Sequence, residues 1–490
     1  MALVINTNVS SLTAQRALAE SSAELETAME RLSTGSKINS AADDAAGLAM
    51  TQRMTAQVRG LAMAVKNAND GQALTQSIEG ALGEVSDMLQ RMRELALQAA
   101  NGTNSSADRT FLQSEVNLLI QEISRVSAST RYNGELILDG TFLNKALQVG
   151  IEEGEHIIFS VGSVAAESIG AYTLVGDGFG ASTAAVTPAA NPTAVTDDIE
   201  ILGYLGSKTT EASPGDTAKE TAVKVNSLAG ETGVKAYAKT YASIGSSSAT
   251  PETYSLRING EITGNFVISS GDVEDAVDQI NQISGATGVT ASSRDNKVIL
   301  FDVDGDDITV ENTATGTNLS VTKLGEDGSS PVENEISLGA DGASDSTRIT
   351  GTLKLVSANP FSIDQKVNGG DTKSGYYDDG AKTSDLKKLT DIRIGTAVGA
   401  GDAISIIDAA LDKVAQMRSD LGAIENRLSY TVSNLMNIAE KTADARSRLD
   451  DADFALESAR LAKAQVVQQA GTQMLAQANQ MTQLVLDLLR

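Results

Sequence analysis

The sequence has no cysteine and only one histidine, His156. Without cysteine, the chain can form no disulfide bond, thiolate metal site or thiol nucleophile. A single histidine excludes a metal site built from several histidines and leaves a histidine-based triad unsupported. His156 stands in a strand-like run between Glu155 and Ile157, and we predict that it is structural. No zinc-protease, phosphate-loop or dinucleotide motif is present, so we predict no enzyme activity and no catalytic, cofactor-binding or metal-binding residues.

Aromatic residues make up 3% of the chain, tryptophan is absent, and apolar residues make up 41%. Cores must therefore be built from aliphatic side chains and methionine, which suits closely packed helices. Basic residues are also few. The formal net charge is -26, which argues against a nucleic-acid partner because phosphate binding requires clustered lysine and arginine. Residues 295–345 hold twelve acidic side chains against Lys297 and Lys323, so we predict a solvated outer surface there.

Proline is absent from both ends, because all six prolines lie between Pro188 and Pro360. A long helix cannot lose a backbone hydrogen bond or accept a kink, so the two ends predict helices. The middle is rich in glycine, serine, threonine and aspartate and predicts strands and turns. The fold class is therefore α+β and multidomain, with long terminal helices around a β-rich central region.

Residues 464–486 form a run of 23 residues without a charge, which raises the question of a membrane span. Seven of these residues are glutamine, and a bilayer core would leave their amides without partners. We therefore predict no membrane insertion, and burial of this segment among other helices. Residues 1–6 have neither a basic nor an apolar signal region, so we expect no cleaved signal peptide.

Helical periodicity predicts five segments at the two ends. The first runs to about Ser33, the second from Asp43 and Asp44 to about Ala100 with a break at 69–71, and the third from 106 to 129. Helical patterning returns near Gly401, and a last helix begins near 450–451. Seven-residue spacing predicts coiled-coil polymerisation residues at Leu18, Leu25, Leu32, Val467, Met474, Met481 and Leu488, joined by Val485.

The central region contains one clear turn and one repeat. Asp304-Gly305, between two short apolar runs, predicts a two-residue hairpin. The pattern N-x-[LI]-x-G-x-T-G-V occurs at 226–234 and, 55 residues later, at 281–289. It predicts a helix that ends on glycine and turns into a strand, so we expect duplicated small α+β modules.

Several motifs follow one another in a fixed order: 6–8 with 11–12, 31–35, 43–48, 66–71 and 89–98 near the start, and 477–480 with the closing 488–490 near the end. In these segments the two ends resemble bacterial flagellin. The central repeats resemble the small "IN" modules of flagellins and hook-associated proteins. Asp487 departs from the pattern, since a small polar or apolar residue is expected there.

This resemblance implies a structural subunit that polymerises through its two ends into the extracellular flagellar filament used for swimming. It implies an inner coiled-coil core from 1–42 and 452–490, a helical rod with a β-hairpin from 43–175 and 400–451, and a variable outer region from 176–399. It also implies secretion through a type III channel. The implied partners are other copies of the chain, an export chaperone, the filament cap protein and hook-associated proteins.

In flagellins the face that matches 90–98 carries contacts between subunits and is recognised by the innate receptor Toll-like receptor 5. The resemblance places Gln90, Arg91, Glu94, Leu95, Gln98 and Glu115 in that face. Spacing of three and four residues puts Arg91, Glu94 and Gln98 together, opposite a core side of Val85, Met88, Met92 and Ala96. The alternative for this face is an ordinary solvated surface with a local ion pair.

Two other functions remain open at this point. A hook–filament junction protein would share similar terminal helices. An adhesin displayed on a filament through 176–399 would need a binding surface that the sequence does not reveal, and serine- and threonine-rich stretches such as 243–250 are candidate glycan carriers.

Overall fold

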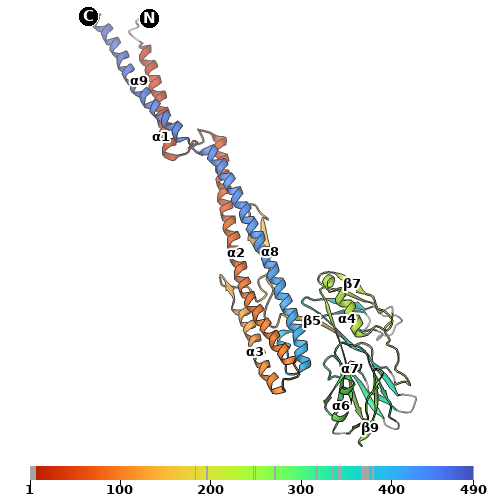
Figure 1. The fold of residues 1–490 in the computed structure, drawn as a ribbon. Helices are drawn as coiled ribbons and strands as arrows, with labels where there is room; N and C mark the ends of the chain where they lie inside the picture. Colours follow the sequence, from red (N-terminus) through yellow and green to blue (C-terminus); the bar gives the residue numbers. More distant parts are fainter. Residues whose placement is uncertain are drawn as a thin grey trace. The chain divides into compact units, whose positions relative to one another are not determined.

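The computed structural model of the chain describes residues 7–182, 184–194, 197–246, 248, 250–269, 272–314, 318–333, 335–339, 345–365, 375–377 and 380–488. The side chains of 481–488 lie outside this description, and with them the predicted seam residues Met481, Val485 and Leu488. The chain packs as two compact units (Figure 1). Unit 1 comprises Met1–Gln76, Asn144–Phe159 and Gly422–Arg490, and unit 2 comprises Ser77–Leu143 and Ser160–Leu421.

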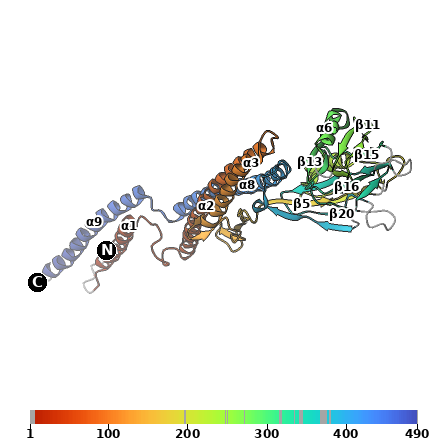
Figure 2. The ribbon, with the colours of Figure 1, turned by 90° about the horizontal axis from the view of Figure 1, so that it is seen from below.

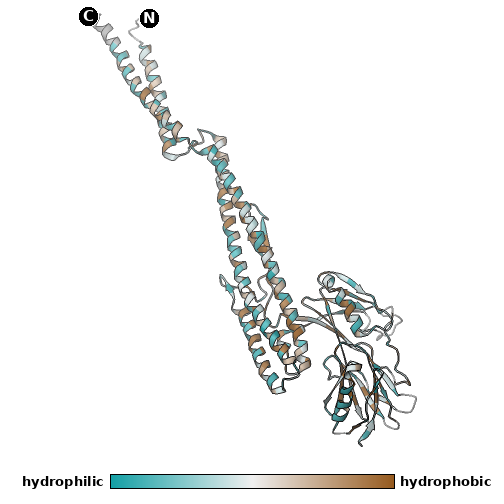
Figure 3. Cartoon of the chain, viewed as in Figure 1, coloured by the Kyte–Doolittle hydropathy of each residue, from teal (hydrophilic) through white to brown (hydrophobic). Residues whose placement is uncertain are grey.

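Long helices account for both ends of the chain, as predicted. They are α1 (Val9–Thr34), α2 (Ala45–Ala100), α3 (Ser106–Ser129), α8 (Ala397–Asp450) and α9 (Phe454–Leu488). Their ends carry recognisable caps. Asn8 and Ser105 accept backbone N–H groups at the starts of α1 and α3, and Asp44 accepts the N–H of Gly47 at the start of α2. Figure 3 shows hydrophilic and hydrophobic residues alternating along α2 and α8, as amphipathic helices require.

The predicted break at 69–71 is wrong, because α2 runs without interruption through Gly71. Gly71 serves packing instead. A Cβ atom at this position would lie 2.6 Å from Leu147 Cδ1 and 3.4 Å from Leu428 Cδ1. Leu147 belongs to β3 (Lys145–Gln148), which pairs with β4 (His156–Phe159) as a hairpin against this part of unit 1. The glycine therefore admits the hairpin to the helix surface.

In unit 2, the second half of α2 packs through a fully buried stripe. Val85, Leu89, Met92 and Ala96 are buried, and α3 adds Val116, Ile120 and Ile123. Ser105 and Asp108 form a capping box that starts α3. A short hairpin, β1 (Arg131–Tyr132) with β2 (Glu135–Leu136), follows α3.

The central region is β-rich, with short helices beside its strands (Figure 2). Its largest sheet has the order β13-β14-β8-β19-β5-β22. Strand β8 also pairs with β16, and β16 in turn pairs with β17. The strands are β5 (Gly170–Gly176), β6 (Ile199–Leu202), β7 (Ser207–Thr210), β8 (Lys235–Ser246), β9 (Glu252–Tyr254), β10 (Leu256–Ile258), β11 (Glu261–Ile262), β12 (Phe266–Ile268), β13 (Val289–Arg294), β14 (Lys297–Asp302), β15 (Ile308–Asn312), β16 (Leu319–Leu324), β17 (Ile336–Leu338), β18 (Ser346–Ile349), β19 (Thr352–Ser357), β20 (Ser362–Gln365), β21 (Gly380–Thr383) and β22 (Asp385–Lys388).

The two copies of the repeat form matching helix–turn–strand modules, as the pattern predicts. The first is α4 (Ala218–Ser227) with α5 (Ala229–Thr232) before β8, and the second is α6 (Glu274–Gln282) with α7 (Ser284–Thr287) before β13. In each, an asparagine side chain pairs with both backbone groups of the residue ten positions later. Asn226 binds Ala236 at 2.8 and 2.9 Å, and Asn281 binds Ala291 at 2.8 and 3.0 Å. Each of these asparagines therefore joins its helix to the following strand by two hydrogen bonds, and we call the two asparagines the asparagine clamps.

The predicted hairpin at Asp304-Gly305 is wrong. β14 pairs with β13 and β8, whereas β15 pairs with β10 and β18. The Asp302 carboxylate accepts the N–H groups of Asp304 and Gly305, both at 3.0 Å, and this curls the chain away from β14. Lys219 of α4 binds the carboxylates of Asp304 and Asp306 at 3.1 and 2.8 Å. Tertiary contacts therefore turn the chain from one sheet into another.

The solvated surface predicted for 295–345 is also wrong for much of that stretch. All six residues of β16 are buried, including Lys323, which is 1% exposed. Strands β14, β15 and β16 supply a core that α6 covers, while α4 covers a second core with β6, β19 and β20. The acidic residues lie mainly in the loops between strands. The net charge of the whole stretch therefore gave no sign of the buried strands within it.

Candidate functional site

Helices α1 and α9 lie antiparallel and side by side in unit 1 (Figure 1). Polar side chains of α1 bind α9 along its length. Asn8 Nδ2 donates to the Ala478 carbonyl at 3.0 Å, and Ser21 Oγ donates to the Ala464 carbonyl at 3.1 Å. At the other end, Arg31 pairs with the buried Glu457 at 3.3 Å. In an antiparallel pair with one register, the residue number on α1 and that of its partner on α9 add up to a nearly constant value. These three bonds meet that condition, so they fix a single register.

The residues between the two helices are small. Ser11, Ser21 and Ala28 of α1 and Ala464 of α9 are buried, and a Cβ atom at Gly471 would lie 3.1 Å from Leu18 Cδ1. Small side chains let the helix axes approach closely. On α9 the contact repeats every seven residues, at Glu457, Ala464, Gly471 and Ala478. We call the small residues Ala464, Gly471 and Ala478, together with Ser11, Ser21 and Ala28 of α1, the small-residue seam.

Two of the predicted polymerisation residues on α9 take no part in the contact with α1. Val467 is 43% exposed and Met474 is 63% exposed, three residues out of phase with the small-residue seam, and their role in polymerisation stays a prediction. Leu18, Leu25 and Leu32 are half-buried at its edge. Other large apolar side chains on these two helices are exposed as well: Val9, Leu12, Met29, Phe454, Leu456 and Val466. Exposed apolar area on this scale marks a surface for a partner.

A second surface lies on α2 and α3 within unit 2. Arg91 binds Glu115 of α3 at 2.9 Å and Glu94 at 2.9 Å. All three side chains are about half exposed, and Gln90 and Gln98 lie exposed on the same helix. Hydrogen bonds from Arg91 to Glu94 and then Glu115 raise the pKa of the guanidinium further above its already high value. The arginine is thus permanently charged and held in one place by carboxylates from two helices.

Leu95 does not lie on this exposed face as predicted, since it is 1% exposed and belongs to the core side of α2. Its neighbour Leu97 is 48% exposed instead. On α3, Phe111 is 75% exposed, and Leu118 is 65% exposed one heptad later. Phe111 and Leu118 are therefore contact candidates that sequence periodicity did not reveal, because their spacing also fits a core.

The described residues show no constellation that suggests chemistry. Among them, no cluster of three or more His, Asp or Glu side chains is arranged to hold a metal ion. His156 is an exposed residue of β4 opposite Gln148. No described helix is both long enough and apolar enough to cross a bilayer.

Comparison with known proteins agrees with the helical ends. Residues 5–143 match the bacterial flagellin N-terminal helical region, and residues 404–489 match the bacterial flagellin C-terminal helical region. The chain is 38% identical to the B-type flagellin of Pseudomonas aeruginosa and 35% identical to a flagellin of Salmonella typhimurium, and both alignments cover all of each chain. A solved structure of FliC from Burkholderia pseudomallei shares 18% identity over 73% of this chain and 99% of its own, with a TM-score of 0.31, which is too low to bear on the assignment. The whole-length identity and the two matched regions show that the chain belongs to the bacterial flagellins, the structural subunits of the extracellular flagellar filament.

Proposed function

We propose that this flagellin polymerises by means of the α1–α9 pair, with different faces for internal and external contacts. The small-residue seam closes the pair within one chain. The exposed face with Val467 and Met474 then packs against neighbouring copies. Burying one such side chain contributes about 1.5–3 kcal/mol. A few of them therefore offset the translational and rotational entropy that a subunit loses when it joins the filament. The observation that carries this proposal is the exposure of Val467 and Met474 beside a contact that is already complete.

Elongation of short filament seeds tests this proposal. We expect the purified chain to lengthen the seeds in electron micrographs, and the double variant Val467→Ser/Met474→Ser to lose at least about tenfold in elongation, because two apolar contacts are removed. The matched control is Ile262→Ser/Val267→Ser, which alters two exposed apolar residues of the central strand-rich part from β5 to β22, 170–388, which we call the β region. Equal elongation by the two double variants would contradict the proposal.

We propose the remaining partners on the same basis. An export chaperone would cover the apolar face of α9 before assembly, and the filament cap and hook-associated proteins would meet the same helices at the filament ends. The division into 1–42 with 452–490, 43–175 with 400–451, and 176–399 remains a prediction about the assembled subunit. Whole-length similarity to flagellins favours the filament subunit over a junction protein or an adhesin.

We also propose that the monomer is recognised by Toll-like receptor 5 through Arg91, Glu94 and Glu115, with Gln90 and Gln98 around them. Support comes from the fixed, half-exposed position of Arg91 between two carboxylates. A side chain held in its bound geometry loses little entropy on binding. Because Leu95 is buried, we assign it a supporting role beneath the face and not a direct contact.

Arg91→Ala should reduce receptor activation by at least about tenfold in a reporter-cell assay, since loss of a charged interface anchor costs about 2 kcal/mol or more. Arg448→Ala is the matched control, because Arg448 forms an exposed ion pair with Asp444 on α8. Circular dichroism should show that both variants keep their helices. Unchanged activation by Arg91→Ala would count against this receptor site.

A further inference from the structure

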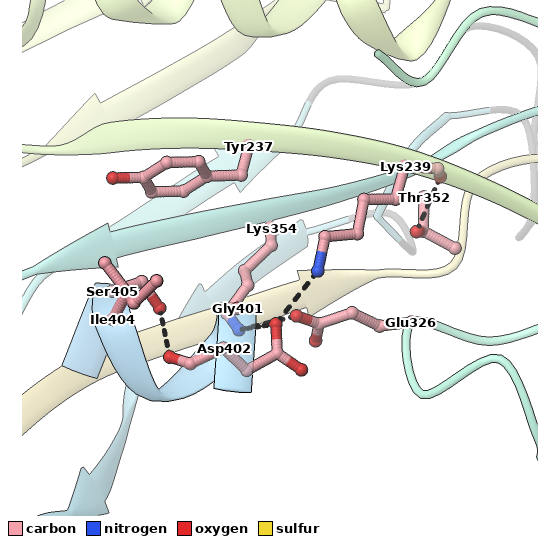
Figure 4. A pocket seen from close by; sticks show the side chains of 9 residues that line it. All are labelled: Tyr237, Lys239, Glu326, Thr352, Lys354, Gly401, Asp402, Ile404 and Ser405. Atoms are coloured by element: carbon pink, nitrogen blue, oxygen red, sulfur yellow. Dashed lines mark hydrogen bonds and ion pairs between the residues drawn. The ribbon is translucent and has the colours of Figure 1, made fainter. Parts of the chain in front are cut away.

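A cavity of about 110 Å³ lies between the large sheet and the start of α8, inside unit 2. Figure 4 shows Lys239 and Lys354 reaching from the strands toward Asp402 of α8. Lys239 Nζ lies 3.0 Å from Asp402 Oδ1, and Lys354 Nζ lies 3.4 Å from the same oxygen. Lys354 also contacts Glu326, at 2.5 Å. We call these four residues the Asp402 cluster.

The charges of the Asp402 cluster balance, since two ammonium groups face two carboxylates. An ionic ligand would therefore find no unpaired charge, which argues against a binding site. Burial would by itself lower the pKa of Lys354, but Glu326 and Asp402 more than offset it and raise that pKa. The four side chains are between 12% and 27% exposed, and the cavity has room for several water molecules. The contact is thus ionic and only partly shielded from solvent.

The contact between the β region and α8 includes further polar groups. Lys235 lies 3.4 Å from Asp412, and Asn359 Nδ2 donates to Gln416 Oε1 at 3.0 Å. A second cavity of about 220 Å³ is lined by Lys235, Asp412 and Gln416. On the apolar side, Val398 of α8 packs against a small cluster that includes Tyr241 of the sheet. The ion pairs among these groups are partly exposed to solvent, so each contributes little to stability and weakens with salt.

The chain enters the β region at β5 and leaves it at β22, and these two strands pair with each other. They approach so closely that a Cβ atom at Gly170 would lie 2.0 Å from the Lys387 carbonyl oxygen. The chain therefore enters and leaves the β region at one place, through two paired strands at the end of the large sheet. The β region can turn about this place once its ionic contacts with α8 open.

We propose that the Asp402 cluster is an ionic latch that holds the β region in one orientation against α8 and releases it when Asp402 is neutralised or screened. Asp402 pairs with both lysines and is the one member of the Asp402 cluster that belongs to α8. Loss of its charge leaves Lys239 without this carboxylate and Lys354 with Glu326 only. The latch is separate from filament formation, which the terminal helices carry out.

Distances between two spin labels test the latch in the full-length monomer. The chain has no cysteine of its own, so Ser293→Cys in β13 and Ser419→Cys in α8 give two defined and exposed label sites. At about 10 mM salt we expect a narrow distance distribution, and at about 1 M, where the Debye length is about 3 Å, a broad one. In Asp402→Asn the distribution should be broad already at low salt, at about twice the width or more.

Asp420→Asn is the matched control, because it makes the same change on an exposed residue of the same helix. It should keep the narrow low-salt distribution. Equal helix content by circular dichroism would show that the variants are folded, and the salt series on the unaltered cluster gives an answer even where Asp402→Asn does not fold. A width that stays constant with salt, or a narrow distribution in folded Asp402→Asn, would overturn the latch.

Discussion

Replacing Gly471 with leucine should raise the critical concentration for filament growth by about five- to a hundredfold. The reason is the small-residue seam. A Cβ atom added at this position would lie 3.1 Å from Leu18 Cδ1. A larger side chain would therefore push α9 away from α1. Overpacking of this kind costs about 1–3 kcal/mol, and each 1.4 kcal/mol is about tenfold in an equilibrium constant. Sedimentation of subunits left in equilibrium with filaments measures the effect.

The size of the side chain should decide the outcome at this position. Gly471→Ala asks only that the mobile end of Leu18 move by a few tenths of an ångström, and alanine gains up to about 1 kcal/mol in helix propensity. It should therefore assemble nearly normally. Gly422→Leu is the control, since a Cβ atom at that position of α8 meets nothing within 4 Å. A Gly471→Leu chain that assembles as well as Gly422→Leu would show that α1 and α9 do not pack through this face in the filament.

Stability of the β region should rise with pH because Lys323 is buried as a cation. Lys323 Nζ donates to the Phe179 carbonyl at 2.7 Å and to Thr350 Oγ1 at 3.1 Å, and it also contacts the Asp177 carbonyl. Burial lowers the pKa of Lys323 from 10.5 to about 8, although nearby carboxylates oppose that shift. Between these values the unfolded chain binds a proton that the folded chain does not, so stability increases with pH. From pH 7 to 9.5 this amounts to about 2 kcal/mol.

Lys323→Met removes the titrating group and should flatten this rise. Urea unfolding followed by near-ultraviolet circular dichroism suits the measurement, because seven of the nine tyrosines lie between Tyr172 and Tyr377. Lys387→Met, at an exposed position of β22, should keep the full pH dependence. A Lys323→Met protein that gains stability with pH as steeply as the Lys387→Met control would show that folding does not lower the pKa of Lys323.

Features with a local cause could be predicted from the sequence. The bounds of α3 agree with the expected 106–129, because its start is set by a serine cap and its body by regular periodicity. The two modules also agree, because Gly233 and Gly288 end their helices in the left-handed conformation that the pattern requires. In these places neighbours in sequence supply the stabilising contacts.

Features that depend on distant partners could not be predicted. Alanine, serine and glycine at heptad positions of α1 and α9 do not stand out in an alanine-rich helix, so the larger Val467 and Met474 attracted the prediction. The Asp304-Gly305 pair carries a hairpin pattern, but Lys219 and the Asp302 carboxylate determine the path of the loop. Lys323 lies in an acidic stretch and yet belongs to a core strand, because its neighbours along β16 are needed for burial.

The asparagine clamps have a consequence for how this chain can vary in length. Asn226 and Asn281 each satisfy backbone groups only ten residues away, within their own module. A module cut out or copied at its ends would carry its hydrogen-bond partners with it. The central region can thus be lengthened by copying a module, whereas removal of the first module would also remove β8, which pairs with β14, β16 and β19.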